Sequence, residues 1–582
     1  MDKRLLDFGG NRFDATASGV SLLVYGAALN VVIILSAPGS TYYIDFASGD
    51  DGNPGTAVSA PWKHCPGDAN ASNVPLGTSL AAGDKVFFKG GVTYKSSVDI
   101  KWSGAPGNPI IYDGNSLGEF GAGKAIMDGE YLDVDTRRYA LVANGTHDLV
   151  IRHFELTRLG GYSTIDWEPD SLPASSKGIG IDLVNCWDIV VDSCTFNEIG
   201  AWANAANMSG NIMWGIGIRV NRSGHNIIIS NCEFTKIGLS AVQINSYTVT
   251  TNISVQACDI HHYVRWGIDI AAAAPHCTIR DVRIEGNQIR DLMQYAASAW
   301  LGLPGTYPHF DGIIMRVGNN PQHPDLQLGT TNQPILISGN RFYNNTTSTA
   351  NSGTSMIFMT GFGGRIVIAN NTFVNTLQSF GGIYVQDIAP DDGTVRADYI
   401  FANNTFFGPD SAINLRTLNG EAYAVAGGTV RIKNNVFYKT NADADYSLKV
   451  HDGLSNPTEL DYNCYYTMRT DGQIGRLAVS GQVASHTLTS LQAEGWELHG
   501  LAVNPDFVDS SAGIGHESSM NNLQLRVSSP CIRQGDNLWQ LFNTDALNRF
   551  RPELGAWTIG AYRAGHSRPQ APTRLRLIEE AD

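Results

Sequence analysis

The amino-acid sequence predicts an all-β protein folded as a parallel β-helix, a solenoid of about ten coils. The first observation is a repeated pattern of two small or polar residues, one variable residue and one large apolar residue. It occurs nine times between residues 190 and 466, at intervals of 26 to 53 residues, as SCTF (193–196), NCEF (231–234), ACDI (257–260), GNQI (286–289), GNRF (339–342), NNTF (370–373), NNTF (403–406), NNVF (434–437) and YNCY (462–465). Intervals of this length indicate a structural repeat with insertions.

The second observation is a five-residue pattern that runs out of phase with the first. It reads GIGID (178–182), GIGIR (215–219), AVQIN (241–245), GIDIA (267–271), GIIMR (312–316), MIFMT (356–360), GIYVQ (382–386), AINLR (412–416) and SLKVH (447–451). Its alternation predicts short strands with one apolar face. A coil with two to three such strands buries its apolar face only by stacking on its neighbours, about 4.8 Å away.

The third observation is a column of small polar residues two places before each large apolar residue. It comprises Cys194, Cys232, Cys258, Asn287, Asn340, Asn371, Asn404, Asn435 and Asn463. Stacked asparagines can hydrogen-bond along the column, and asparagine tolerates the left-handed backbone that tight turns need. We expect the three cysteines to be reduced packing residues rather than disulfides, because eight cysteines in 582 residues are too few for a disulfide scaffold.

These features resemble the right-handed β-helix superfamily of pectate-lyase-like proteins, over roughly residues 40 to 565. The segment YYIDFASGDDGNPGTAVSAPWKH (42–64) is similar to the start of many secreted β-helix carbohydrate-active proteins, and NPDFVD (504–509), SSPCIRQGDN (528–537) and TIGAYR (558–563) are similar to their C-terminal ending. The resemblance implies a right-handed solenoid. It does not specify a reaction, because lyases, hydrolases, epimerases and non-catalytic proteins share this frame.

The ends of the chain predict export. Residues 1–40 contain a nearly continuous apolar run, 20–37, followed by small residues, which favours a cleaved signal peptide. An uncleaved anchor would be the only membrane contact, and a buried capping helix is the structural alternative. We expect a secreted, periplasmic or cell-surface monomer, with a β-helix over 41–565 (coils about 108–466, C-terminal cap about 467–565) and a tail at 566–582. The net charge of −15 excludes a nucleic-acid partner held by a general positive field.

The five-residue strands also predict the outer face of the solenoid. Their third places carry Gly180, Gly217, Gln243, Asp269, Ile314, Phe358, Tyr384, Asn414 and Lys449, and their fifth places carry Asp182, Arg219, Asn245, Ala271, Arg316, Thr360, Gln386, Arg416 and His451. Polar and charged residues concentrate between Asp182 and Arg316. The longest insertions border the same stretch, so we expect an elongated polar groove there.

Aromatic residues on and beside these insertions suit the flat faces of sugar rings. Expected substrate-binding residues are Asp182, Gln243, Asn245, Trp214, Trp266, Trp300, Tyr307, His309 and Arg416. A satellite core under folded-over insertions is the alternative explanation for the aromatics. Either way, the expected partner is a polysaccharide or oligosaccharide.

Two carboxylates in consecutive coils suggest glycoside hydrolysis, which needs one protonated and one ionised carboxyl group. Asp311 lies in HFDGI (309–313), which is similar to the catalytic strand motif of polygalacturonase-like hydrolases; the place of that motif's second Asp holds Ile314, and Asp269 fills it one coil earlier. Arg219 and Arg316 would hold one carboxylate ionised. The catalytic set expected for a hydrolase of an acidic polysaccharide is therefore Asp269, Asp311, Arg219 and Arg316.

Two alternatives remain open at the level of sequence. A polysaccharide lyase would use the arginines to grip uronate carboxylates, and an arginine base would require a strongly lowered pKa. A lyase would also make a Ca²⁺ cofactor conceivable, with Asp259, Asp281 and Glu285 as candidate ligands, although we expect no metal site among the histidines. A non-catalytic carbohydrate-binding protein would use the same groove.

Overall fold

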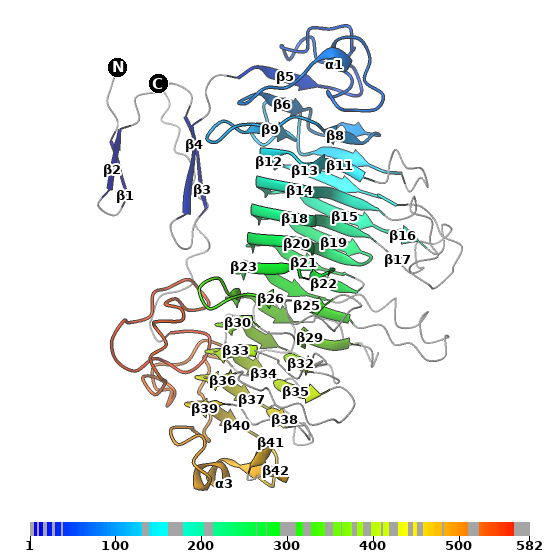
Figure 1. The fold of residues 1–582 in the computed structure, drawn as a ribbon. Helices are drawn as coiled ribbons and strands as arrows, with labels where there is room; N and C mark the ends of the chain where they lie inside the picture. The colour runs from blue at the N-terminus through cyan, green and yellow to red at the C-terminus, as the bar shows by residue number, and fades with distance from the viewer. Residues whose placement is uncertain are drawn as a thin grey trace.

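The protein is a right-handed parallel β-helix whose coils stack in chain order (Figure 1). The structure is a computed structural model. It describes residues 5–8, 11–14, 20–25, 30–35, 39–130, 139–160, 178–202, 212–213, 215–263, 265–274, 276–291, 310–317, 327–343, 353–361, 364–374, 381–387, 397–408, 411–417, 429–439, 446–450, 458–479, 482–509 and 523–563. Within these ranges the predicted fold class is confirmed.

One side of the solenoid is a sheet of twelve parallel strands, and nine of them come from the first sequence pattern. Its strands are β7 (Thr93–Tyr94), β10 (Ala125–Asp128), β13 (Phe154–Thr157), β15 (Thr195–Ile199), β19 (Glu233–Ile237), β21 (Asp259–His261), β24 (Gln288–Arg290), β28 (Arg341–Tyr343), β31 (Thr372–Val374), β34 (Thr405–Phe407), β37 (Val436–Tyr438) and β40 (Cys464–Tyr466). We call it the twelve-stranded face.

The other two sides belong to one 24-stranded sheet, which bends between them. The first face contains β8 (Val98–Ile100), β11 (Tyr139–Asn144), β22 (Trp266–Ala272), β25 (Phe310–Val317), β29 (Gly353–Gly361), β32 (Ile383–Asp387), β35 (Ile413–Thr417), β38 (Leu448–Val450) and β41 (Gln473–Val479). The second face contains β5 (Thr41–Ile44), β6 (Lys85–Phe88), β9 (Ile110–Asp113), β12 (His147–Arg152), β23 (Thr278–Glu285), β26 (Gln327–Leu328), β27 (Ile335–Ser338), β30 (Gly364–Ala369), β33 (Ala397–Ala402), β36 (Thr429–Lys433) and β39 (Glu459–Asp461).

Three strands are 14 to 17 residues long because they continue from the first face into the second. They are β14 (Ile179–Asp192), β18 (Ile216–Ser230) and β20 (Ser240–Gln256). From β22 onward the two faces have separate strands. The five-residue pattern therefore marked only the first-face part of these coils.

The remaining elements lie outside these stacks. They are the antiparallel pairs β1 (Leu5–Phe8) with β2 (Asn11–Asp14), β3 (Val20–Tyr25) with β4 (Asn30–Leu35) and β16 (Ala201–Trp202) with β17 (Ile212–Met213), the strand β42 (Gln482–Thr487) against β41, and the short helices α1 (Asn73–Gly77) and α3 (Leu488–Ala493). In the described part of the chain, no helix is long and apolar enough to cross a membrane. The leader over 1–40 remains an expectation.

The core is filled by aromatic rings stacked from coil to coil. Phe342, Phe373, Phe406 and Phe437 stack with ring centroids 4.6 to 5.3 Å apart. Small residues at the first-face corner make room for these rings. A Cβ atom on Gly180 would lie only 2.7 Å from the ring of Phe196, so only glycine fits there.

The predicted asparagine column forms a buried hydrogen-bonded ladder. Each side-chain amide donates to the carbonyl oxygen of the next, from Asn287 through Asn340, Asn371, Asn404 and Asn435 to Asn463, at 2.9 to 3.1 Å. Each Nδ2 also donates to a backbone carbonyl, as Asn404 does to Ile368 at 2.9 Å. The ladder ends at Glu497, whose Oε1 accepts from Asn463 Nδ2 at 2.7 Å and from the Tyr465 hydroxyl at 2.6 Å.

Replacement of Asn404 by leucine breaks this ladder at its middle. The backbone N–H of Asn371 and one N–H of its side-chain amide lose their acceptor, and the Ile368 carbonyl loses the Asn404 amide as a donor, all in the buried interior. An unpaired buried polar group costs about 1–3 kcal/mol, so we expect the free energy of unfolding to fall by about 3 kcal/mol or more. Denaturant unfolding of both proteins measures the loss. An effect below about 0.5 kcal/mol would contradict the role of the ladder.

The C-terminal segment 523–563 packs along the second face and is held by a second asparagine column. Nδ2 atoms of Asn370, Asn403 and Asn434 donate to carbonyls of that segment at 2.9 Å, and all three residues have positive φ. Arg551, 2% exposed, lies over the Trp557 ring and donates to Asn370 Oδ1 at 2.8 Å.

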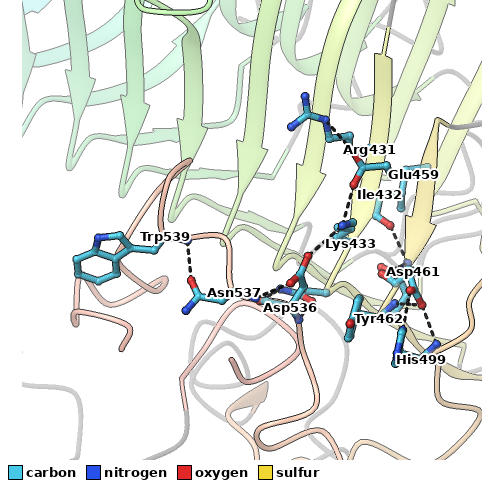
Figure 2. A network of polar contacts seen from close by, with 12 residues as sticks. Arg431, Ile432, Lys433, Glu459, Asp461, Tyr462, His499, Asp536, Asn537 and Trp539 are labelled. Carbon is cyan, nitrogen blue, oxygen red and sulfur yellow. Dashed lines mark hydrogen bonds and ion pairs between the residues drawn. The ribbon is translucent and has the colours of Figure 1, made fainter. Parts of the chain in front are cut away.

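Charged groups join the same segment to the last coils (Figure 2). Lys433 on β36 lies between Glu459 on β39, 2.7 Å away, and Asp536, 2.9 Å away. Burial alone would lower the pKa of Lys433, but the two carboxylates outweigh it and raise the pKa. These contacts fix where residues 536–539 lie on the solenoid.

Candidate functional site

The candidate site lies on the outer surface of the first face, around β14, β18, β20, β22 and β25 (Figure 1). Strand register corrects the predicted columns for the first two coils. Asp182 pairs with Arg219, Arg219 with Gln243, Gln243 with Asp269 and Asp269 with Ile314. Asp182 and Arg219 therefore belong to the same column as Gln243 and Asp269, two residues from the place predicted. We call this the central column.

The reason for the correction is the glycine pattern. The five-residue pattern puts the first glycine of GIGID and GIGIR at the strand start, but the second glycines, Gly180 and Gly217, occupy the corner positions that face the core rings. The prediction that Arg219, Arg316 and Arg416 share one column is wrong for Arg219. Arg316 pairs with Ala271, and Arg416 pairs with Gln386 in the adjacent column.

Two carboxylates of the central column are each held by an arginine fork. Arg219 donates through Nε and Nη2 to Asp182 Oδ1 and Oδ2 at 2.8 and 2.7 Å. Burial opposes the charge of Arg219, but Asp182 outweighs it and raises the pKa of the guanidinium. Bidentate pairs of this kind are strong and geometrically specific.

The second fork closes around Asp269, which is fully buried. Arg316 donates through Nε to Oδ1 at 2.9 Å and through Nη2 to Oδ2 at 2.8 Å, and Gln243 Nε2 donates to Oδ2 at 2.8 Å. Burial alone would lower the pKa of Arg316, but the Asp269 carboxylate outweighs burial and raises this pKa. Both oxygens of Asp269 thus accept hydrogen bonds from side chains of neighbouring coils.

Trp266 lies beside this second fork, under two guanidinium groups. Arg316 is 4.9 Å and Arg265 is 4.2 Å from the centroid of its indole ring. Such cation–π contacts favour arginine over other cations because its planar group stacks. The Trp266 side chain is buried, and neither its Nε1 nor Arg265 Nε has a hydrogen-bond partner among the described residues.

Arg265 differs electrostatically from the two forked arginines. Burial, and then repulsion by Arg316, lower its pKa to about 10, although Asp269 and Asp311 act in the opposite direction. No carboxylate in the described ranges is recorded within ion-pair distance of Arg265. Among the described residues, Arg265 is therefore a partly exposed arginine without a directly paired carboxylate.

Asp311 stands one coil further along and at the corner of the face. It pairs with Trp266 in register, while Asp269 pairs with Ile314, so the two aspartates lie in consecutive coils as predicted but three places apart along the strands. Asp311 is 1% exposed, and its Oδ1 accepts from the Ser355 backbone N–H at 3.1 Å and hydroxyl at 3.3 Å.

Several predicted site residues lie elsewhere. Asn245 hydrogen-bonds Asn221 at 3.2 Å in the column beside the central one. Trp214, Trp300, Tyr307 and His309 lie outside the described residues, as does the side chain of Arg416. The candidate Ca²⁺ ligands are not on this face, since Asp259 is on β21 with Arg290 forked to it, and Asp281 and Glu285 are on β23. The described residues contain no group of three or more potential metal ligands.

Sequence reasoning missed three residues of this site. Arg265 directly precedes Trp266, and an arginine–tryptophan pair just before a polar strand was the available signal. Tyr139 begins β11 and interacts with Arg219. Tyr247, 47% exposed on a bulge of β20, lies in the electrostatic surroundings of Arg316. Neither tyrosine belongs to either repeated pattern.

Comparison with known proteins finds no family and only distant structural likenesses. No family model matches the chain, and no curated protein sequence matches it. Among solved structures it is similar to pectate lyase Pel9A, with 14% identity over 91% of this chain and 98% of that chain and a TM-score of 0.44. It is also similar to the GH136 lacto-N-biosidase from Eubacterium ramulus, with 13% identity over 75% of this chain and a TM-score of 0.41.

A third similar structure is the tailspike protein of E. coli bacteriophage HK620 in complex with a pentasaccharide, with 12% identity over 67% of this chain and 58% of that chain and a TM-score of 0.39. The chain spans slightly less than two thirds, 64%, of the Eubacterium ramulus enzyme. All of these are parallel β-helix proteins, and so is this chain. The likeness concerns the fold, whereas the function has to be argued from the site.

Proposed function

We propose that the protein cleaves an acidic polysaccharide on the outer surface of its first face, by β-elimination at a uronate residue. The observation that carries this proposal is Arg265, a guanidinium stacked on Trp266 beside a second arginine, with a pKa lowered to about 10. Elimination needs a base, and the lowered pKa that would let an arginine act as one could not be predicted from the sequence. The sequence also predicted cleavage of an acidic polysaccharide, but by hydrolysis; we propose elimination instead.

The charge balance around Trp266 supports an acidic substrate. Asp269 compensates Arg316, but no carboxylate of the described chain is recorded pairing with Arg265. A uronate carboxylate bound by Arg316 would lie near Arg265 as well and would offset the repulsion between the two guanidinium groups. Arg316 would help to bind it, because Asp269 occupies only the Nε and Nη2 positions of that guanidinium and Nη1 is a further donor.

The reaction class follows from the opposite pKa shifts of Arg265 and Arg316. In elimination a base takes the proton from C5 of the uronate, the C4–O bond breaks, and its electrons leave with the oxygen as the C4=C5 double bond forms. Lowering the pKa of an arginine from 12.5 to about 10 raises its neutral fraction at neutral pH by about 300-fold. Arg265 would take the C5 proton while Arg316 neutralises the carboxylate.

Hydrolysis by the predicted pair is less well supported. A general acid must have a carboxyl group free to give its proton to the substrate, whereas both oxygens of Asp269 accept from the Arg316 fork and the Gln243 amide. One observation keeps hydrolysis as the second candidate. Asp311 is a nearly inaccessible carboxyl group whose one oxygen is fixed by Ser355, an environment suited to an acid or a nucleophile.

The test is incubation of the protein with a panel of acidic and neutral polysaccharides. New reducing ends and the ultraviolet absorbance of an unsaturated uronate are followed together. We expect both signals to rise in parallel on a uronate polymer, and neither on neutral polymers. Reducing ends without absorbance would overturn elimination in favour of hydrolysis at Asp311, and silence on every polymer that the protein binds would indicate a binding protein.

A further inference from the structure

Two cysteines from distant parts of the chain meet where the last coil joins the C-terminal segment. Cys464 is the first residue of β40, and Cys531 belongs to the segment that packs along the solenoid. Neither has any exposed surface. Both belong to one small cluster of buried residues that also contains Phe507 and Ile559, separate from the main core.

Local hydrogen bonds hold both cysteines beside the same segment, 503–505. Cys464 Sγ donates to the Val503 carbonyl at 3.5 Å. The Ser529 hydroxyl donates to the Pro505 carbonyl at 2.6 Å and accepts from the Cys531 backbone N–H at 3.2 Å. Segment 503–505 is therefore bound from both sides, by the coil and by the C-terminal segment. Contact with the Cys531 thiol, and then burial, raise the pKa of the Cys464 thiol well above its ordinary value.

The cysteines of the main core have a different setting. Cys194, Cys232 and Cys258 stack in consecutive coils, and each thiol donates to the carbonyl two residues earlier in its own coil, at 3.2 to 3.4 Å. Neighbouring thiols of this stack also contact one another, but all three belong to successive coils of the main core. Cys464 and Cys531 instead face each other across a boundary between two separately packed parts, which a covalent bond can join.

We propose that Cys464 and Cys531 form a disulfide that fastens the C-terminal segment to the last coil. Its formation removes two protons and two electrons from the two thiols. A small-molecule disulfide such as oxidised glutathione accepts them, through a mixed disulfide that the second thiolate resolves, and leaves as two thiols. Because both cysteines are inaccessible after docking, the exchange takes place before the C-terminal segment has packed.

The bond can be detected in the full-length protein. The chain is refolded in a glutathione redox buffer, denatured, treated with an alkylating reagent and analysed by mass spectrometry of its peptides. We expect six of the eight cysteines to be alkylated and one cross-linked peptide to contain Cys464 and Cys531. Alkylation of all eight cysteines, or cross-linking of a different pair, would overturn the proposal.

A second measurement uses the same sequence in two redox states, so it does not depend on a variant that folds. Limited proteolysis within 523–563 should be at least about tenfold slower in the oxidised protein than after reduction. Cys531→Ser should abolish this difference, whereas the matched control Cys232→Ser should retain it. Equal cleavage rates in the oxidised and reduced wild-type protein would contradict a fastening role.

Discussion

Replacement of Arg265 by methionine should lower the rate of cleavage of an acidic polysaccharide by at least about 100-fold, the usual contribution of a positioned general base. Methionine keeps the length of the side chain and its packing on Trp266 but removes the guanidinium. Initial rates on the same polymer measure the loss. The matched control is Arg283→Met on the second face, whose side chain is 49% exposed. It should leave the rate unchanged.

The pH dependence of the wild-type reaction gives an independent check on Arg265. A base with a pKa of about 10 is mostly protonated at neutral pH, so kcat/KM should rise about tenfold per pH unit until the pH approaches 10. A bell-shaped profile with an acidic optimum would instead indicate carboxyl chemistry at Asp311. An unchanged rate in Arg265→Met would remove the basis of the proposed mechanism.

Glu497 should make the protein less stable as the pH rises from about 4.5 to 7. Burial raises its pKa from 4.5 to about 7, although hydrogen bonds from Tyr465 and Asn463 act in the opposite direction. The folded state therefore holds a proton that the unfolded chain releases, and up to about 3 kcal/mol of stability is lost across this window and stays lost above it. Glu497→Gln, which resembles the protonated acid, should lack this slope.

Denaturant unfolding of the wild type and Glu497→Gln at pH 5 and pH 8 measures this effect. The difference between the two proteins is the relevant quantity, because it cancels other groups. Asp45 and Asp51 have lowered pKa values, so the stability they contribute is lost only as the pH falls below about 4. His153 and His262 also have lowered pKa values, so their contribution to stability rises with pH near pH 6.5, opposite in sign to that of Glu497. Identical slopes in both proteins would contradict a protonated Glu497.

The repeated patterns predicted the fold because each residue type has a single local role. A large apolar residue every coil fills the interior, and an asparagine two places earlier satisfies the turn. The same reasoning assigned the wrong register to Asp182 and Arg219. Glycine alternates with isoleucine in both GIGI runs, so periodicity alone could not tell which glycine turns the corner.

The candidate site was predictable in composition but not in pairing. Sequence placed Asp269, Arg316 and Trp266 on one face, and the structure joins them. It could not show that an arginine fork would hold Asp269, because that depends on which neighbouring coil supplies the arginine. It also could not show the lowered pKa of Arg265, which results from burial beside a second guanidinium.

The most direct test of the account is binding of one pair of oligosaccharides that differ only in charge. A uronate oligomer and its carboxyl-reduced neutral counterpart are titrated by calorimetry into the wild type, Arg265→Met and Arg283→Met. We expect the wild type and Arg283→Met to bind the acidic oligomer at least about tenfold more tightly than the neutral one, and Arg265→Met to lose that preference. Equal affinity of the wild type for both oligomers would contradict an acidic-polysaccharide site at Arg265 and Trp266.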